Sequence, residues 1–302
     1  MYFRAVSQPP SMEYLERRRE LVESRLESVL ESTEPEALTG RLEHVSLSGG
    51  KRVRPMVTLL AFEAAGGVLA GEGGRDAPAS RTAVDFAVGV ELVHNASLVV
   101  DDIIDDSALR RGVDSAWAAF GHGPAIVASD GLLGEAFSLF SADERAMRVV
   151  SEAMVELGEG EATELVARPS TEREYMELAR RKTGALFRAA AELGAIAADA
   201  DAYTVEAFGR YAERVGIAFQ IRDDVLDATA DAADLGKPTG QDEAMERPSL
   251  VQITEMAPAE ANARAREEAD AALEALESAE AVGSEALEYL EDLAEFVVVR
   301  ER

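Results

Sequence analysis

The chain has 302 residues, 58 of them acidic and 30 basic, which gives a formal net charge of −28. Such a charge repels nucleic acid and anionic membranes, so proteins that bind either through a basic surface are excluded. The absence of cysteine excludes disulfides, thiolate metal sites and cysteine nucleophiles.

The sequence is typical of a helical protein. Ala, Leu, Glu and Arg are strong helix formers, and apolar residues recur at helical spacing between glycine- and proline-rich breakers. In chain order, we predict helices over residues 12–32, 52–65, 80–106, 124–141, 143–157, 172–199, 203–229, 258–278 and 283–298. With no composition break, the sequence favours one all-α domain over residues 1–302, a large helix bundle with a central cavity.

No signal for insertion or export is apparent. No uninterrupted apolar run approaches the roughly 18 residues of a membrane span. The start Met1-Tyr2-Phe3-Arg4 lacks the apolar segment of a secretion signal. We therefore expect a cytoplasmic protein with no stable membrane insertion and no nucleic-acid partner.

Two aspartate clusters interrupt apolar stretches of the predicted helices. Residues 101–105 and 223–227 both have the pattern Asp-Asp-x-x-Asp, in which the first and last Asp share a helix face. Carboxylates beside Val, Ile and Leu need a counter-charge, and their oxygens suit Mg²⁺, which commonly bridges carboxylates to a substrate phosphate. The clusters predict metal-mediated binding of a diphosphate, whereas the ordinary alternative is a solvated acidic face.

Lysine is rare enough in this chain to be informative. The three lysines, Lys51, Lys182 and Lys237, all lie in glycine-containing motifs. Residues 49–55 place Lys51, Arg52 and Arg54 between two glycines and an apolar helix, a pattern typical of an anion site. The alternative is a helix N-terminus with chance basic residues.

Two more features accompany the first aspartate cluster. Arg110 and Arg111 follow it and offer bidentate geometry to phosphate, although a surface arginine could instead pair with Asp106 or Asp114. His94 lies two helical turns before the cluster and roughly on its face, so the spacing allows either a functional or a structural role.

With these segments assembled, the chain resembles the trans-isoprenyl diphosphate synthases, or polyprenyl synthetases, over roughly residues 40–250. The resemblance rests on the order of the motifs: Gly-Gly-Lys-Arg-Val-Arg-Pro at 49–55, the first cluster with Arg-Arg-Gly, Lys-Thr at 182–183, and Phe-Gln before the second cluster. It implies the all-α isoprenoid synthase fold and an enzyme that joins isopentenyl diphosphate to allylic diphosphates.

The resemblance also implies a role for each residue. About three Mg²⁺ would be held by Asp101, Asp102, Asp105, Asp223, Asp224 and Asp227. The allylic diphosphate would be bound by Arg110, Lys182, Thr183, Gln220 and Lys237, and isopentenyl diphosphate by Lys51, Arg54, His94 and Arg111. The catalytic set would be Asp101, Asp102, Asp105, Arg110, Lys182, Asp223, Asp224 and Lys237. The resemblance also implies an all-trans product and a homodimer.

The chain departs from the family pattern in places. Val100 stands where a histidine is common, Glu161 and Glu164 stand in for Gln and Asp, and Arg247 replaces a second lysine. We expect the first two of these differences to weaken the support of the metal or the diphosphate, whereas Arg247 stands in for the missing lysine.

Product length is partly readable from the resemblance. In the family, bulky residues four and five positions before the first Asp stop elongation, and here they are the small Ser97 and Ala96. We therefore expect a product beyond fifteen carbons, with geranylgeranyl diphosphate first, unless Phe137 or Phe140 resets the cavity floor.

Three other functions are weighed against this one. A terpene cyclase or head-to-head prenyl synthase needs no isopentenyl site. Residues 49–55 and His94 indicate such a site, so they argue against this alternative. A non-catalytic subunit of a heteromeric synthase would be expected to lose aspartates. An acidic structural protein that binds divalent ions would leave unexplained why the chain groups Lys51, Arg54, Arg110, Arg111, Lys182 and Lys237 in these motifs.

The net charge makes a testable prediction about salt. Self-repulsion disfavours the compact state, and ions screen it over a Debye length of about 10 Å at 0.1 M. We expect the free energy of unfolding to rise with KCl concentration, as in a salt-adapted host. Thermal unfolding measured from low to molar KCl checks this, and full stability in low salt would contradict it.

Overall fold

The computed structural model describes residues 12–70, 78–229, 249–254, 256–279 and 281–299. The all-α prediction is confirmed. The helices are α1 (Met12–Glu31), α2 (Glu36–Ser46), α3 (Val53–Ala64), α4 (Pro78–Ile104), α5 (Ala116–Phe120), α6 (His122–Phe140), α7 (Glu144–Ala162), α8 (Glu172–Ala179), α9 (Ala185–Ala197), α10 (Ala202–Thr229), α13 (Leu250–Thr254), α14 (Pro258–Glu277) and α15 (Glu285–Val299).

Shorter elements interrupt this helical pattern. A π-helical turn, η1 (Thr163–Ala167), ends α7, and a second, η2 (Arg180–Gly184), joins α8 to α9. The strands β1 (Leu109–Arg110) and β2 (Val113–Asp114) form an antiparallel hairpin after α4. Sequence analysis missed α2, α5, α13 and the hairpin, and the helix predicted over 172–199 contains the π-helical turn η2 between α8 and α9.

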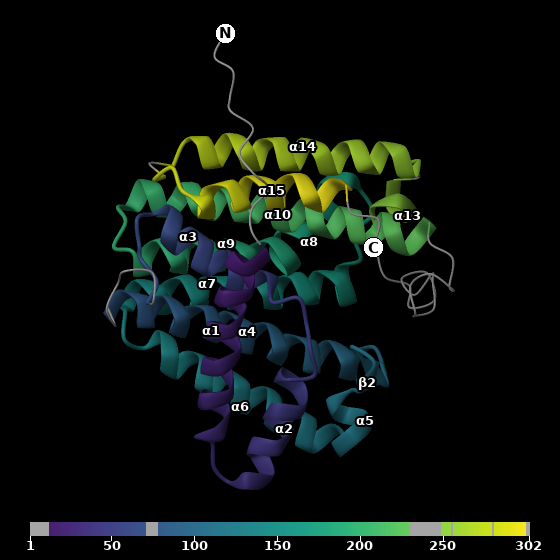
Figure 1. The fold of residues 1–302 in the computed structure, drawn as a ribbon. Helices are drawn as coiled ribbons and strands as arrows, with labels where there is room; N and C mark the ends of the chain where they lie inside the picture. Colours follow the sequence, from purple (N-terminus) through teal and green to yellow (C-terminus); the bar gives the residue numbers. More distant parts are fainter. Residues whose placement is uncertain (1–11, 71–77, 230–248, 255, 280, 300–302) are drawn as a thin grey trace.

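The helices stack in layers around α9 (Figure 1). Helix α9 packs against α3, α4, α7 and α10, while α14 and α15 cover α10 on one side and α6 covers α4 on the other. The close approach of α3 and α9 depends on Gly194, because a Cβ there would lie 2.1 Å from the Thr58 carbonyl oxygen. The apolar core continues from Tyr14 in α1 to Val297 in α15.

Helix α4 is the central scaffold of the fold. In the described part of the chain it is the one helix long and apolar enough to cross a membrane, yet 72% of its most apolar window is buried inside the protein, as in a core helix. It ends at Ile104, beside the hairpin, and α10 ends on the same side of the molecule (Figure 1). The two aspartate clusters therefore lie at the same end of the bundle.

Candidate active site

A cavity of about 310 Å³ opens beside the C-terminal parts of α4 and α10. Most of the residues predicted for substrate or metal binding meet there, from segments far apart in the sequence. Its lining includes Lys51, Arg54, His94, Ser97, Asp101, Arg111, Lys182, Thr183, Gln220 and Asp223. The apolar part of its wall comes from Leu98, Leu157, Leu186, Phe187 and Phe219.

The two aspartate clusters each contribute their first Asp to this cavity. Asp101 lines it from the last turn of α4, and Asp223 lines it from α10. Asp105 follows the end of α4, where its backbone N–H still donates to the Asp101 carbonyl at 2.9 Å. The lining found among the described residues contains none of the other cluster aspartates, so their predicted metal contacts stay predictions.

Asp102 instead faces away from the cavity and pairs with Arg110. Only 3% of Asp102 is exposed, and Arg110 Nε lies 2.9 Å from its Oδ1. Burial raises the pKa of Asp102, and the Arg110 guanidinium opposes that rise. In the described chain Arg110 pairs with Asp102 and not with Asp106 or Asp114, and its contact with the allylic diphosphate stays a prediction.

Asp224 is held in a buried hydrogen-bond network. Its carboxylate accepts from Tyr175 OH at 2.6 Å, Gln220 Nε2 at 2.9 Å and Leu250 N at 3.0 Å. Gln220 Oε1 in turn accepts from Thr183 Oγ1 at 2.8 Å. Asp224 therefore ties α8, α10 and α13 together, and sequence analysis missed Tyr175 because nothing near it marks a motif.

The cationic wall surrounds His94. Arg54 Nη1 lies 3.2 Å from His94 Nε2, and the Arg54 guanidinium stacks 4.6 Å from the centre of the Phe187 ring. Burial and the nearby arginines hold the pKa of His94 well below its ordinary value, so this ring is neutral near pH 7. Burial and Arg111 lower the pKa of Arg54 to about 10, against the opposing effect of Glu91.

The backbone around Gly50 and Arg111 is shaped to bring two loops together. The hairpin turn has φ of 54° at Arg111 and 83° at Gly112, as a two-residue turn of this type requires. Arg111 Nη1 then donates to the Gly49 carbonyl at 2.6 Å. Gly50 has φ of 129°, and a Cβ there would lie 3.0 Å from the Arg111 guanidinium carbon, which explains the glycine pair.

Lys182 is positioned by the π-helical turn η2. Gly160 of α7 lets the two segments touch, because a Cβ there would lie 3.0 Å from Lys182 N. The Lys182 ammonium is 3.1 Å from Glu161 Oε1 and pairs also with Glu164. These carboxylates raise the pKa of Lys182 despite its burial, while burial raises the pKa of Glu161 to about 7.

The donor set fits Mg²⁺ together with a diphosphate. No group of three acidic or histidine side chains close enough to hold a metal alone is found among the described residues. Mg²⁺ commonly takes one or two carboxylates and completes its shell with water and substrate phosphates, which matches Asp101 and Asp223. Arg54 Nε is buried with no hydrogen-bond partner in the described part of the chain, as expected of a donor intended for an anion.

Two predicted residues lie outside the described part of the chain, namely Lys237 and Arg247. Of the two predicted chain-length residues, Ser97 lines the cavity. Ala96 is buried, and its carbonyl accepts from Ser129 Oγ of α6 at 3.1 Å. Glu91 also lines the cavity and was missed, although its place one turn before His94 is a readable signal.

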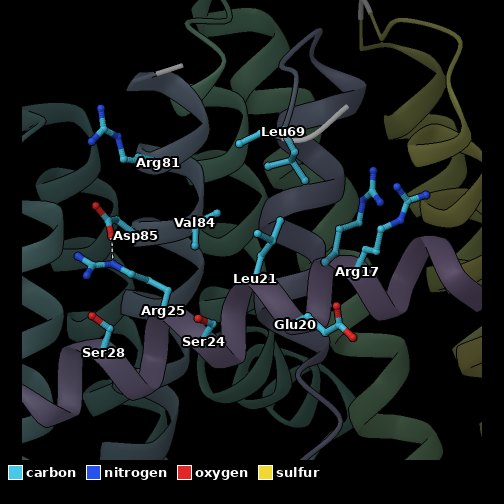
Figure 2. Close-up of a pocket in the computed structure, with 12 residues that line it drawn as sticks. Arg17, Glu20, Leu21, Ser24, Arg25, Ser28, Leu69, Arg81, Val84 and Asp85 are labelled. Carbon is cyan, nitrogen blue, oxygen red and sulfur yellow. Dashed lines mark hydrogen bonds and ion pairs between the residues drawn. The ribbon is translucent and has the colours of Figure 1, made fainter. Parts of the chain in front are cut away.

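A larger cavity lies elsewhere. A cavity of about 940 Å³ lies between α1, Leu69 and the first turns of α4, and none of the predicted site residues lines it. Figure 2 shows the side chains around it. Its basic residues include Arg25, whose Nε donates to Asp85 at 2.6 Å, and Arg18, which pairs with Glu63. Its size alone therefore does not indicate a site.

Comparison with known proteins agrees with this geometry. A family model described as polyprenyl synthetase matches residues 35–290. Over 231 residues the chain is 37% identical to geranylgeranyl diphosphate synthase of Methanosarcina mazei, covering 73% of this chain and 68% of that one. It is 35% identical over 224 residues to geranylfarnesyl diphosphate synthase of Aeropyrum pernix, covering 70% and 68%.

A solved structure is similar over nearly the whole chain. Geranylgeranyl pyrophosphate synthetase from the archaeon Geoglobus acetivorans superposes with a TM-score of 0.82 at 31% sequence identity, covering 96% of this chain and all of that one. The similarity therefore includes the helices that carry both aspartate clusters.

Proposed function

The chain belongs to the polyprenyl synthetase family and is a chain-elongating trans-prenyltransferase, and we propose that it forms geranylgeranyl diphosphate or a longer all-trans product. Its substrates are isoprenyl diphosphates. The observation that supports a condensing enzyme best is that one cavity is lined both by Asp101 and Asp223 and by Arg54, His94 and Arg111. Two diphosphates can therefore be bound side by side.

The predicted roles fit this arrangement. Asp101 and Asp223, supported by the other aspartates of the two clusters, would hold Mg²⁺ against the allylic diphosphate. When bound, the metal offsets negative charge on the departing pyrophosphate. Lys182, with Thr183 and Gln220 beside it, would contact the same diphosphate, and the scarcity of lysine in the chain favours this role.

The second substrate would lie against the cationic wall. Lys51, Arg54, neutral His94 and Arg111 would bind the isopentenyl diphosphate and direct its double bond toward the allylic carbon. The C–O bond of the allylic diphosphate breaks, the double bond of isopentenyl diphosphate forms the new C–C bond, and the released pyrophosphate takes the lost proton. Leu186, Phe187 and Phe219 would exclude water from the carbocation. A cyclase would have no use for this second anion site.

The first experiment is a product-length assay. We expect purified protein with Mg²⁺, labelled isopentenyl diphosphate and farnesyl diphosphate to form a product of twenty carbons or more, and EDTA to abolish it. Chromatography of the labelled products at several KCl concentrations measures this. A fifteen-carbon limit with shorter primers would overturn the length assignment, whereas folded protein without product at any salt would favour a non-catalytic subunit.

Product length would be set along α4. Ser97 and Ala96 add little bulk beside the first cluster. Further down the helix, a Cβ on Gly89 would lie 2.4 Å from the Phe140 ring of α6, so this ring covers Gly89 and packs 5.9 Å from Phe86. Gly89 lies eight residues before Ser97, about 12 Å along the helix, so Phe140 is the side chain that would limit a product growing along α4.

Large side chains near the first cluster should shorten the product. We expect Ser97→Phe, and likewise Ala96→Phe, to shift the main product to fifteen carbons or fewer, because the added ring fills the cavity. Ala79→Phe is the matched control, since Ala79 is an exposed residue of the same helix. An unchanged product from Ser97→Phe, or the same shortening from the control, would contradict this account.

We also propose a homodimer. The outer face of α6 exposes half of Ile126 and Val127, and α7 exposes 61% of Val155. Exposed apolar groups on adjacent helices are typical of a contact with another protein, and a second copy of this chain is the simplest partner. Sedimentation at high KCl should give twice the 32.3 kDa of one chain. A monomer that remains active would contradict this proposal.

The cytoplasmic location and the salt-adapted host remain proposals that composition supports. The chain has no cysteine and a formal charge of −28, which suit a reducing and salt-rich interior. The KCl titration tests the second of them directly.

A further inference from the structure

Glu91 of α4 lies beneath the cationic wall and is not one of the residues predicted for substrate binding. Only 2% of it is exposed. Its Oε1 is 2.7 Å from Arg52 Nη1 and 3.9 Å from Arg111 Nη2. One carboxylate thus connects the loop before α3 with the hairpin after α4, which are 59 residues apart in the sequence when counted from Arg52 to Arg111.

The buried side chain of Arg52 anchors the loop before α3. Its backbone has φ of 51°, a conformation that non-glycine residues rarely adopt, and its side chain is 1% exposed. The guanidinium also donates to Glu23 of α1 at 2.9 Å and to the Ser46 carbonyl of α2 at 2.7 Å. The neighbours of Arg52 in the sequence, Lys51 and Arg54, are therefore held in place by its buried side chain.

Arg111 is fixed from the other side. Its guanidinium donates to the Gly49 carbonyl and to Asn95 Oδ1 at 3.3 Å, and it covers Gly50. Three guanidinium groups, those of Arg52, Arg54 and Arg111, thus gather in a small volume, where each repels the others. Glu91 opposes this repulsion, since its charge acts to raise the pKa of each of the three, although burial still holds those of Arg54 and Arg111 below their ordinary value.

We propose that Glu91 is the positioning residue of the isopentenyl diphosphate site. It holds Arg52 and Arg111, and through them Lys51 and Arg54, in a binding arrangement before the substrate arrives. This inference rests on the proposed function, because it assumes that these cations bind isopentenyl diphosphate. Glu91 does not touch the substrate in this account, so its loss affects binding of one substrate and not the other.

The test replaces Glu91 with glutamine, which keeps the shape and removes the charge. We expect Glu91→Gln to raise the KM for isopentenyl diphosphate about tenfold or more. The KM for the allylic primer should change less than about twofold, because Lys182 and the aspartates do not depend on Glu91. Glu91→Asp keeps the charge but shortens the side chain, and we expect a smaller rise in the same KM.

The matched control is Glu268→Gln in α14. Glu268 is also 2% exposed and pairs with two arginines, Arg214 at 2.7 Å and Arg264 at 2.5 Å, but it does not line the cavity. It reports the general effect of removing a buried charge, and it should leave both KM values unchanged. Thermal unfolding of all variants, measured in the same KCl, separates loss of fold from loss of binding.

The outcomes distinguish this proposal from the function on which it rests. Wild-type protein without prenyltransferase activity would overturn the function itself. Active wild type with an unchanged isopentenyl KM in folded Glu91→Gln, or equal rises for both substrates, would overturn the positioning role alone. If Glu91→Gln does not fold, Glu91→Asp decides, because an unchanged isopentenyl KM in that variant also contradicts the proposal.

Discussion

Pairing of buried charges determines which groups can face the cavity. An isolated charge in a protein interior is costly unless it is paired and hydrogen-bonded, so the walls of the site are built from ion pairs. Glu91 with Arg52 and Asp102 with Arg110 are such pairs, each with a nearly inaccessible carboxylate. Asp101 lines the cavity, while Asp102, its neighbour in the sequence, pairs with Arg110 of the hairpin. Two adjacent and chemically identical residues therefore have different surroundings in the structure.

Local backbone conformation positions the cationic side chains of the site. The positive φ at Arg111 and Gly112 turns the chain back toward α3, and the absence of a side chain at Gly50 leaves room for the Arg111 guanidinium. The π-helical turn η2 places Lys182 beside the end of α7. Arg111 and Lys182 thus depend on turns that depart from regular secondary structure, in keeping with the frequent occurrence of such departures at functional sites.

The sequence predicted most of the long helices because their apolar periodicity follows from burial on one side. It also predicted many of the residues that line the cavity, because the motifs that contain them can be read in order along the chain. It missed α2 and the hairpin because short elements depend on contacts with distant segments, here between His44 and the Asp114 carbonyl at 2.8 Å. It could not separate Asp224 from Asp223 either, because the Tyr175 hydroxyl that holds Asp224 comes from another helix.

The turn η2 has a consequence for how this protein can change over evolutionary time. A π-helical turn holds one residue more than the surrounding α-helix, so its natural origin is an insertion rather than a substitution. Removing one residue between Arg180 and Gly184 would replace the π turn by an ordinary α turn that spans nearly the same rotation, so α8 and α9 would keep their relative orientation. A single-residue deletion here would therefore leave the packing of both helices intact and change only the directions of the side chains within the turn, Lys182 among them.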